Sequence, residues 1–131
     1  MLDTNVLVSA ALGQGHSRRL LAALIARREL ITSDAILEEL DETLRSDPRL
    51  RRLVTARLRA RLIAVLSRAS SFVDPKAFAE APDPDDAAIL GTAVAAHAPL
   101  VTGDKALLRA RPPGLRIVTV REALEELDLL P

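Results

Sequence analysis

The stretch LVTGDKALLRA at residues 100–110 contains the pattern that decides the fold. Its first three residues, 100–102, are a short apolar run with the length and composition of a buried strand. One glycine later comes Asp104, and residues 105–109 have the spacing of a short helix. The chain thus passes from strand to acidic residue to helix within ten positions.

The same alternation recurs along the chain. Short strands are expected at 30–32, 71–73 and 117–120. Amphipathic helices are expected after Ser17 as N-cap, after Ser33 as N-cap to residue 44, once or twice within 50–66, from Asp86 onward and over 122–127. Strands that alternate with helices favour a parallel sheet covered on both faces, so the predicted fold class is α/β.

Length and composition predict one domain over residues 1–131. The chain is 49% apolar and 27% charged, which is typical of a globular protein. It has no run of roughly 20 apolar residues that would span a membrane, and an aspartate stands where a signal peptide carries positive charge. It also has no cysteine, so metal ligands must be oxygen or histidine. We therefore expect a cytoplasmic protein with no membrane partner.

Charge is balanced overall but unevenly distributed. The 18 basic and 18 acidic side chains cancel, so net charge does not indicate a nucleic-acid partner. Between residues 45 and 68, however, eight arginines stand against a single acid, Asp47. This arginine run is either a solvated or partner-binding face, or a track for the phosphates of RNA. The sequence leaves both interpretations open.

Four acids are predicted to meet at one edge of the sheet. Asp3 follows the first apolar residues, and Asp104 follows the strand at 100–102. Asp86 opens a helix and lies on the face of that helix that is expected to be buried. Glu39 lies on the helix that leaves the same edge. Ligands of open parallel sheets bind beyond the carboxyl ends of the strands, which is where these residues fall.

Carboxylates gathered this closely repel one another unless a cation stands among them. Mg²⁺ or Mn²⁺ prefers oxygen ligands and is completed by water and substrate phosphate. Such a site carries out phosphodiester hydrolysis, in which the metal lowers the pKa of a bound water and stabilises the attacking and leaving oxygens. Asn5 and Thr102 flank the cluster and are candidates to orient ligands or water through hydrogen bonds.

Each acid also has an ordinary structural explanation. Asp3 and Asp104 are suited to cap the helices that follow them, and Asp83 with Pro84 forms a good helix start. Glu39 alone would pass as a solvated helix residue. Only the coincidence of four acids at one edge favours a site.

These residues lie in four motifs that together resemble the PIN domain family, and are most similar to its VapC-like branch of toxins from toxin–antitoxin modules. The motifs are LDTNVLVSAAL at 2–12, SDAILEEL at 33–40, DPDDAAILGTA at 83–93 and LVTGDKALL at 100–108. Each motif alone is a weak sign of the family. The four motifs in this order and spacing cover nearly the whole chain and are a strong one.

The resemblance implies a Rossmann-like three-layer α/β/α sandwich with a central parallel sheet. It also implies an Mg²⁺- or Mn²⁺-dependent endoribonuclease, a hydrolase that acts on RNA, with a homodimer and a small antitoxin as protein partners. The implied metal-binding and catalytic residues are Asp3, Glu39, Asp86 and Asp104; Glu39 is preferred to Glu38 because it directly precedes Leu40. Asp83 or Asp85 is implied as an outer contact.

One departure concerns the first strand. Family members usually carry three or four apolar residues before the first aspartate, and here only Met1 and Leu2 precede Asp3. We expect a very short first strand, and we expect apolar residues added ahead of Met1 to raise thermal stability.

Two other functions compete with the nuclease. A PIN-like module without activity would bind RNA or a protein partner, although the complete set of acids argues against it. A phosphohydrolase of the haloacid dehalogenase kind needs a second aspartate two residues after the first, and Asn5 stands there.

With two Phe and no Trp or Tyr, the chain has no aromatic platform for stacking bases, so RNA recognition must use phosphate and shape.

Overall fold

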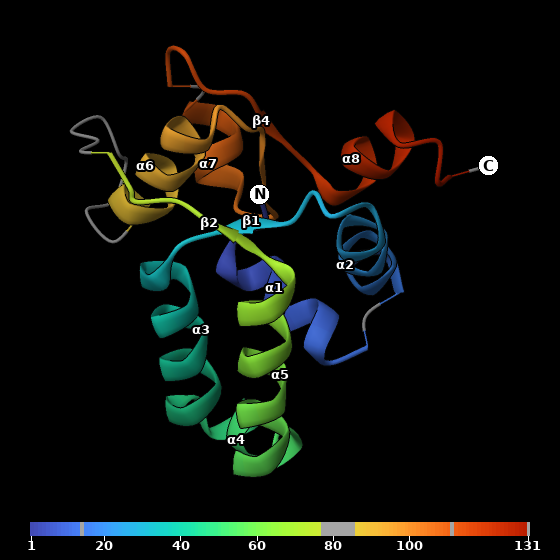
Figure 1. The fold of residues 1–131 in the computed structure, drawn as a ribbon, viewed down its shortest axis with the longest axis vertical. Helices are drawn as coiled ribbons and strands as arrows, with labels where there is room; N and C mark the ends of the chain where they lie inside the picture. Colours follow the sequence, from blue (N-terminus) through green and yellow to red (C-terminus); the bar gives the residue numbers. More distant parts are fainter. Residues whose placement is uncertain (14, 77–85, 111, 131) are drawn as a thin grey trace.

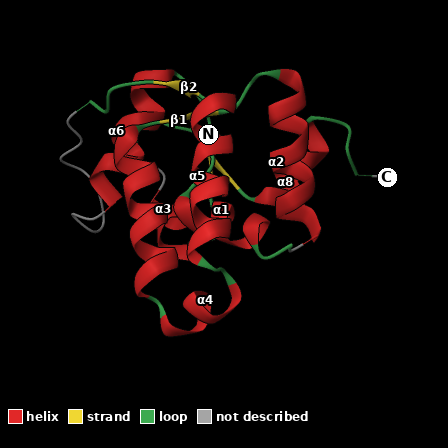
Figure 2. Ribbon diagram, turned by 60° about the horizontal axis from the view of Figure 1, so that its bottom comes forward, coloured by secondary structure: helices red, strands yellow, loops and turns green. Residues whose placement is uncertain are grey.

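The computed structural model describes residues 1–13, 15–76, 86–110 and 112–130. Within these ranges short strands alternate with helices (Figure 1). The elements are α1 (Thr4–Ala11), α2 (Gly15–Arg27), β1 (Ile31–Thr32), α3 (Asp34–Ser46), α4 (Pro48–Leu53), α5 (Ala56–Ala69), β2 (Ser71–Phe72), α6 (Ala87–Ala96), β3 (Leu100–Val101), α7 (Lys105–Ala110), β4 (Ile117–Val118) and α8 (Val120–Glu126). Helix dominates, and the strands are short (Figure 2).

All strand pairs are parallel, as the alternating pattern predicts. β1 pairs with β2, with Ile31 opposite Ser71, and β3 pairs with β4, with Leu100 opposite Ile117. In the described part of the chain these form two separate two-stranded sheets, so one continuous central sheet is not confirmed. Each strand is only two residues long, which leaves little backbone to extend a ladder.

The first strand is reduced to a single bridge between Leu2 and Val101. The N–H of Val101 donates to the carbonyl of Met1, and the N–H of Asp3 donates to the carbonyl of Val101, both at 2.9 Å. This short pairing is sufficient to place Asp3 beside the end of β3.

Helices begin where the strands end because polar residues cap them there. The hydroxyl of Ser33 accepts from the N–H of Ile36 at the start of α3, as expected. Thr119 and Glu122 form a capping box that starts α8. The expected strand over 117–120 was therefore wrong at its end, since Val120 is already the first residue of α8.

The other helix predictions hold with two refinements. α2 begins at Gly15, so Ser17 lies inside the helix and is not its N-cap. The arginine-rich segment forms two helices: Asp47 caps α4 ahead of Pro48, and Thr55 caps α5.

Leucines from most of the helices, together with Leu2 and Leu100, make one core. α2 packs against α1 and α8, while α3 packs against α1, α5 and α6. In Figure 1, α6 and α7 lie above β1 and β2, and α1, α3 and α5 lie below them. The most deeply buried leucines are Leu2, Leu20, Leu40, Leu44, Leu66, Leu90, Leu100, Leu107 and Leu124. None of the described helices combines the length and the apolar character needed to cross a membrane.

The amino group of Met1 is buried beside a cavity. It donates to the carbonyl of Pro99 at 3.1 Å, and burial lowers its pKa to about 6. The cavity, of about 180 Å³, is lined by Met1 together with apolar side chains of α2, β1 and β4, among them Leu24, Ile31 and Val118. A buried amino group and a mostly apolar hollow thus lie side by side.

We expect two or three apolar residues added ahead of Met1 to raise the melting temperature by several degrees. One side chain that fills the cavity contributes about 2 kcal/mol, and the amino group moves out of the core to solvent, where it no longer bears a desolvation cost. Calorimetry would compare this chain with one extended by Gly and Ser, which moves the amine without filling the space. An unchanged melting temperature for the apolar extension would contradict the prediction.

Candidate active site

Asp3 is a buried carboxylate at the carboxyl end of the shortened first strand. Its backbone is extended, and α1 begins at the next residue, so the side chain is held where strand turns into helix. The residue is only 4% exposed. A charge in such a place is costly unless other groups stabilise it.

Thr102 joins Asp3 to Asp104. Its fully buried hydroxyl donates to Oδ2 of Asp3 at 2.6 Å and accepts from the backbone N–H of Asp104 at 3.0 Å. One hydroxyl thus fixes the position of the first acid and of the backbone that carries the other. The sequence placed Thr102 beside the cluster, but only the structure gives it these two partners.

Asp104 is half-buried and also caps α7. Its Oδ1 accepts from the N–H of Ala106 at 2.8 Å and of Leu107 at 3.3 Å. The ordinary interpretation of this residue as a cap is therefore correct. It does not exclude a role as a metal ligand, because a carboxylate offers about four acceptor sites on two oxygens.

Burial raises the pKa of the Asp3 carboxyl above its ordinary value of 3.8. The hydrogen bond from Thr102 and the backbone N–H groups of Thr4 and Asn5 lower this pKa, and the negative charge of Asp104 raises it further. The pKa remains raised in sum, so the protein bears a cost for keeping Asp3 ionised at neutral pH.

Asp86 stands at the start of α6, half-buried, with no side-chain hydrogen bond that caps the helix. α6 is tied to the edge through a buried contact: Thr92 donates to the hydroxyl of Ser33 at 2.9 Å. Asp86 lies six residues before Thr92, about 9 Å along the helix. The expected helix start at Asp86 is confirmed.

Glu39 is exposed on the middle of α3. It shares a helix face with Thr43, which is four residues on. Thr43 lines a groove together with Asn5 of α1, so this face of α3 looks toward the start of α1. Asn5 itself is exposed, two residues after Asp3.

The structure brings Asp3 and Asp104 together, and it does not group Glu39 and Asp86 with them. Among the described residues, no three His, Cys, Asp or Glu side chains lie close enough together to hold a metal ion. Asp83 and Asp85 lie outside the described residues. The four-acid site therefore stays a prediction.

The pair of Asp3 and Asp104 nevertheless suits a hard cation. No Arg or Lys in the described ranges forms an ion pair with Asp3, so its buried charge lacks a protein counter-charge. Mg²⁺ is commonly held by one or two carboxylates, with water and substrate phosphate completing its shell. The oxygen donors present thus fit such an ion.

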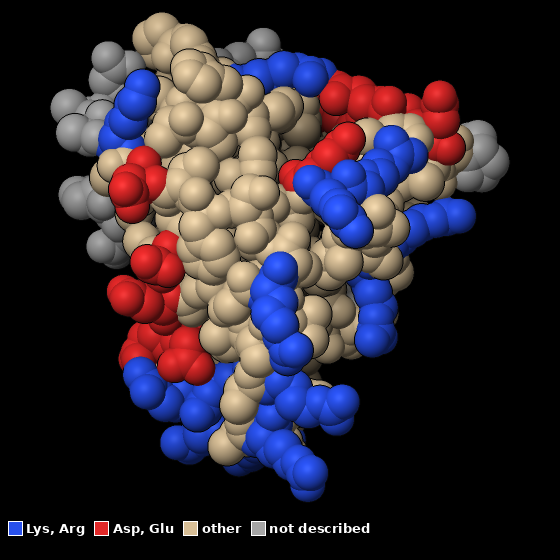
Figure 3. Space-filling model, in the orientation of Figure 1, with Lys and Arg blue, Asp and Glu red and all other residues tan. Residues whose placement is uncertain are grey.

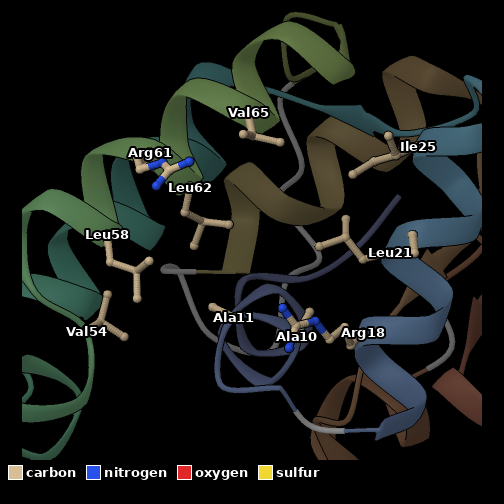
Figure 4. A pocket seen from close by; sticks show the side chains of 11 residues that line it. Ala10, Ala11, Arg18, Leu21, Ile25, Val54, Leu58, Arg61, Leu62 and Val65 are labelled. Carbon is tan, nitrogen blue, oxygen red and sulfur yellow. The ribbon is translucent and has the colours of Figure 1, made fainter.

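An apolar hollow lies away from these acids, between α2 and α5 (Figure 4). Its volume is about 360 Å³, and Leu21 and Ile25 of α2 face Leu58 and Leu62 of α5 across it. None of the four predicted acids lines it. Its lining is mostly apolar, with Arg18 and Arg61 besides, and contains no carboxylate that would hold a metal.

Comparison with known proteins gives one finding. A family model described as PIN domain matches residues 1–106, a span that includes all four predicted acids. No curated protein and no solved structure matches the chain.

We expect Asp3→Asn to fold and, without metal, to be more stable than the parent chain at neutral pH, by about 1 kcal/mol. The carboxyl has a raised folded-state pKa, so its contribution to stability is full below pH 3.8 and is lost as the pH rises through that raised value. The advantage of asparagine should therefore be small at pH 4.5 and larger at pH 7.5.

Urea unfolding in EDTA at both pH values measures this difference. Asp128→Asn is the matched control, since Asp128 is exposed and its φ of 55° is one that asparagine tolerates. A variant less stable than the parent chain at pH 7.5 would show that Asp3 is satisfied without a cation.

Proposed function

The chain belongs to the PIN domain family, whose members are generally nucleases that use divalent metal ions, and we propose that it is a metal-dependent endoribonuclease. The observation that carries the proposal is the buried Asp3 carboxylate, which has no ion pair with an Arg or Lys among the described residues and which Thr102 holds beside Asp104. Family membership supports a nuclease-type hydrolase, and cleavage of RNA with Mg²⁺ or Mn²⁺ is the narrower step that we propose.

In this proposal Asp3 and Asp104 hold the ion, and Glu39 and Asp86 complete the site from α3 and α6. The ion, when bound, supplies positive charge to the scissile phosphate and lowers the pKa of the attacking water. Thr102 keeps the Asp3 carboxylate in one orientation, so Asp3 does not have to be ordered when substrate arrives. Asp104 faces the surface side of the edge, where it is half-exposed and able to meet substrate.

Family membership implies an α/β fold. We propose in addition that the two strand pairs and Leu2 belong to one central sheet of a three-layer sandwich. Supporting this, all pairings are parallel, and helices lie both above and below β1 and β2 in Figure 1.

The alternative is a PIN-like module without catalytic activity that binds RNA or a protein. The observation that favours it is that the described acids form no group of three or more suited to a metal. It predicts metal or RNA binding without turnover, whereas the nuclease requires both.

For protein partners, we propose a toxin that pairs with a second copy of itself and is inhibited by a small antitoxin. Both partners need apolar surface, and the hollow between α2 and α5 offers it, with Arg18 and Arg61 among its lining residues. These two arginines suit an acidic amphipathic segment of the antitoxin. Sedimentation at two concentrations tests the pairing; a monomer throughout would contradict it.

We expect the purified chain to cleave RNA in the presence of Mg²⁺ or Mn²⁺, and we expect EDTA to stop this cleavage. Asp3→Asn and Asp86→Asn should each lower the cleavage rate by more than about 100-fold, because each removes a proposed metal ligand. Gel assays on structured and unstructured RNA measure the rates, and circular dichroism verifies folding.

Asp128→Asn again serves as the control and should cleave like the parent chain. Calorimetric titration with Mg²⁺ or Mn²⁺ separates the two hypotheses. Metal binding without cleavage would favour the silent module, and cleavage that survives in Asp3→Asn would place the chemistry elsewhere.

A further inference from the structure

A groove of about 400 Å³ runs between α1, α3 and α4. Its lining includes Asn5, two residues after Asp3, and Arg49 and Leu53 of α4. From Asn5 to Leu12 the wall formed by α1 is about 10 Å long at 1.5 Å per residue. The groove thus lies between the start of α1, two residues after Asp3, and the arginine-rich helix α4.

The arginines of α4 form a cationic surface. Arg49, Arg51 and Arg52 of α4 are all exposed, and Arg57 follows at the start of α5. Figure 3 shows basic side chains gathered at the lower end of the molecule, where α4 lies in Figure 1. We call Arg49, Arg51 and Arg52 the α4 arginines; of these, Arg49 lines the groove.

Carboxylates neutralise little of the charge of the α4 arginines. Two neighbouring arginines do have acidic partners: Arg45 pairs with Glu42, and Arg59 pairs with Asp41 at 3.0 Å. Of the α4 arginines, by contrast, only Arg49 meets a carboxylate in the described part of the chain. That is Asp47, 4.0 Å away, whose Oδ1 already accepts two backbone N–H groups of α4. These guanidinium groups remain available for an anionic partner.

The groove is lined mainly by apolar side chains. Val8 of α1, Leu12 directly after α1 and Leu50 of α4 are partly buried along it, and Thr43 and Asp47 add polar groups. Leu53 stands at its edge with 65% of its surface exposed. A mainly apolar lining beside cations suits a nucleic-acid strand, whose sugars contact the apolar side chains while its phosphates meet the cations.

We propose that this groove holds the RNA strand that leads away from the cleavage site, with the α4 arginines on its phosphates. The inference rests on the proposed nuclease function and extends it to substrate binding. At about 3.4 Å per stacked nucleotide, a 10 Å path holds about three nucleotides. The arginines therefore contact phosphates several nucleotides from the bond that is cut.

The position of Asn5, which lines the groove two residues after Asp3, favours RNA over an acidic protein segment. A protein helix that lay on the α4 arginines would have no reason to follow the groove to Asn5 and Asp3. A substrate strand must reach that end, because the cleaved bond lies there.

The test is binding of a fluorescein-labelled single-stranded RNA of 12 nucleotides, measured by anisotropy in EDTA at several salt concentrations. Without metal the RNA is not cut, so this readout does not depend on activity. We expect the double variant Arg51→Gln, Arg52→Gln to bind about 10-fold more weakly. The slope of log affinity against log salt should fall by about 1.4, or about 0.7 for each lost phosphate contact.

The matched control is the double variant Arg19→Gln, Arg68→Gln, which removes two exposed arginines of α2 and α5 that form no ion pair in the described part of the chain. It should keep both the affinity and the slope. If both double variants lose affinity equally, only net charge matters and the proposal is overturned. Equal binding by Arg51→Gln, Arg52→Gln and the parent chain overturns it as well.

A second pair of variants tests the groove itself. Leu53→Asp places a negative charge at its edge, whereas Ala60→Asp adds the same charge at an exposed residue of α5 that lines neither this groove nor the hollow between α2 and α5. We expect only Leu53→Asp to weaken RNA binding. If Leu53→Asp instead leaves RNA binding intact and alters sedimentation, the groove binds protein and the proposal falls.

The outcomes also separate this inference from the nuclease proposal. RNA binding that depends on the α4 arginines, in a chain that never cleaves, contradicts the nuclease and leaves the groove as a binding site. Cleavage of a 12-nucleotide RNA that is indifferent to these arginines contradicts the groove and leaves the nuclease.

Discussion

Two backbone hydrogen bonds to Val101 hold the candidate site together. They tie Met1 and Asp3 to the edge of β3, and they carry Asp3 into the interior beside Thr102. Without this pairing the first acid would sit on a loose N-terminal segment, unburied and far from Asp104. The shortest strand in the fold therefore decides whether the two carboxylates meet.

Burial of the Asp3 carboxylate lowers the stability of the protein and keeps a negative charge in a fixed position. A buried carboxylate whose nearest acidic neighbour raises its pKa is unfavourable in the bare protein, and the hydroxyl of Thr102 only partly offsets this. Functional sites commonly carry such local costs, because groups ordered before the ligand arrives need not be ordered by it. The surrounding core of fully buried leucines supplies the stability that tolerates the cost.

Sequence patterns predicted the elements well where caps and apolar spacing agree. Ser33 starts α3 as expected, and the strand before Asp104 is followed at once by α7. The errors arose where two signals compete. Val120 continues an apolar run, yet the capping box of Thr119 and Glu122 already turns the chain into α8, and this box was visible in the sequence. The alternation of strands and helices predicted one central sheet. The described strands, each two residues long, form two separate pairs instead.

The sequence alone determined that Asp3 and Asp104 each follow a short apolar run and precede a helix, because strand length, caps and helical period are local properties. Only the tertiary structure decided that Thr102 bonds to an acid 99 positions away, that Asp3 is buried, and that α1, α3 and α4 enclose a groove. Such contacts depend on how distant segments pack, and packing is set by the shapes of all the core side chains together. No local pattern encodes it.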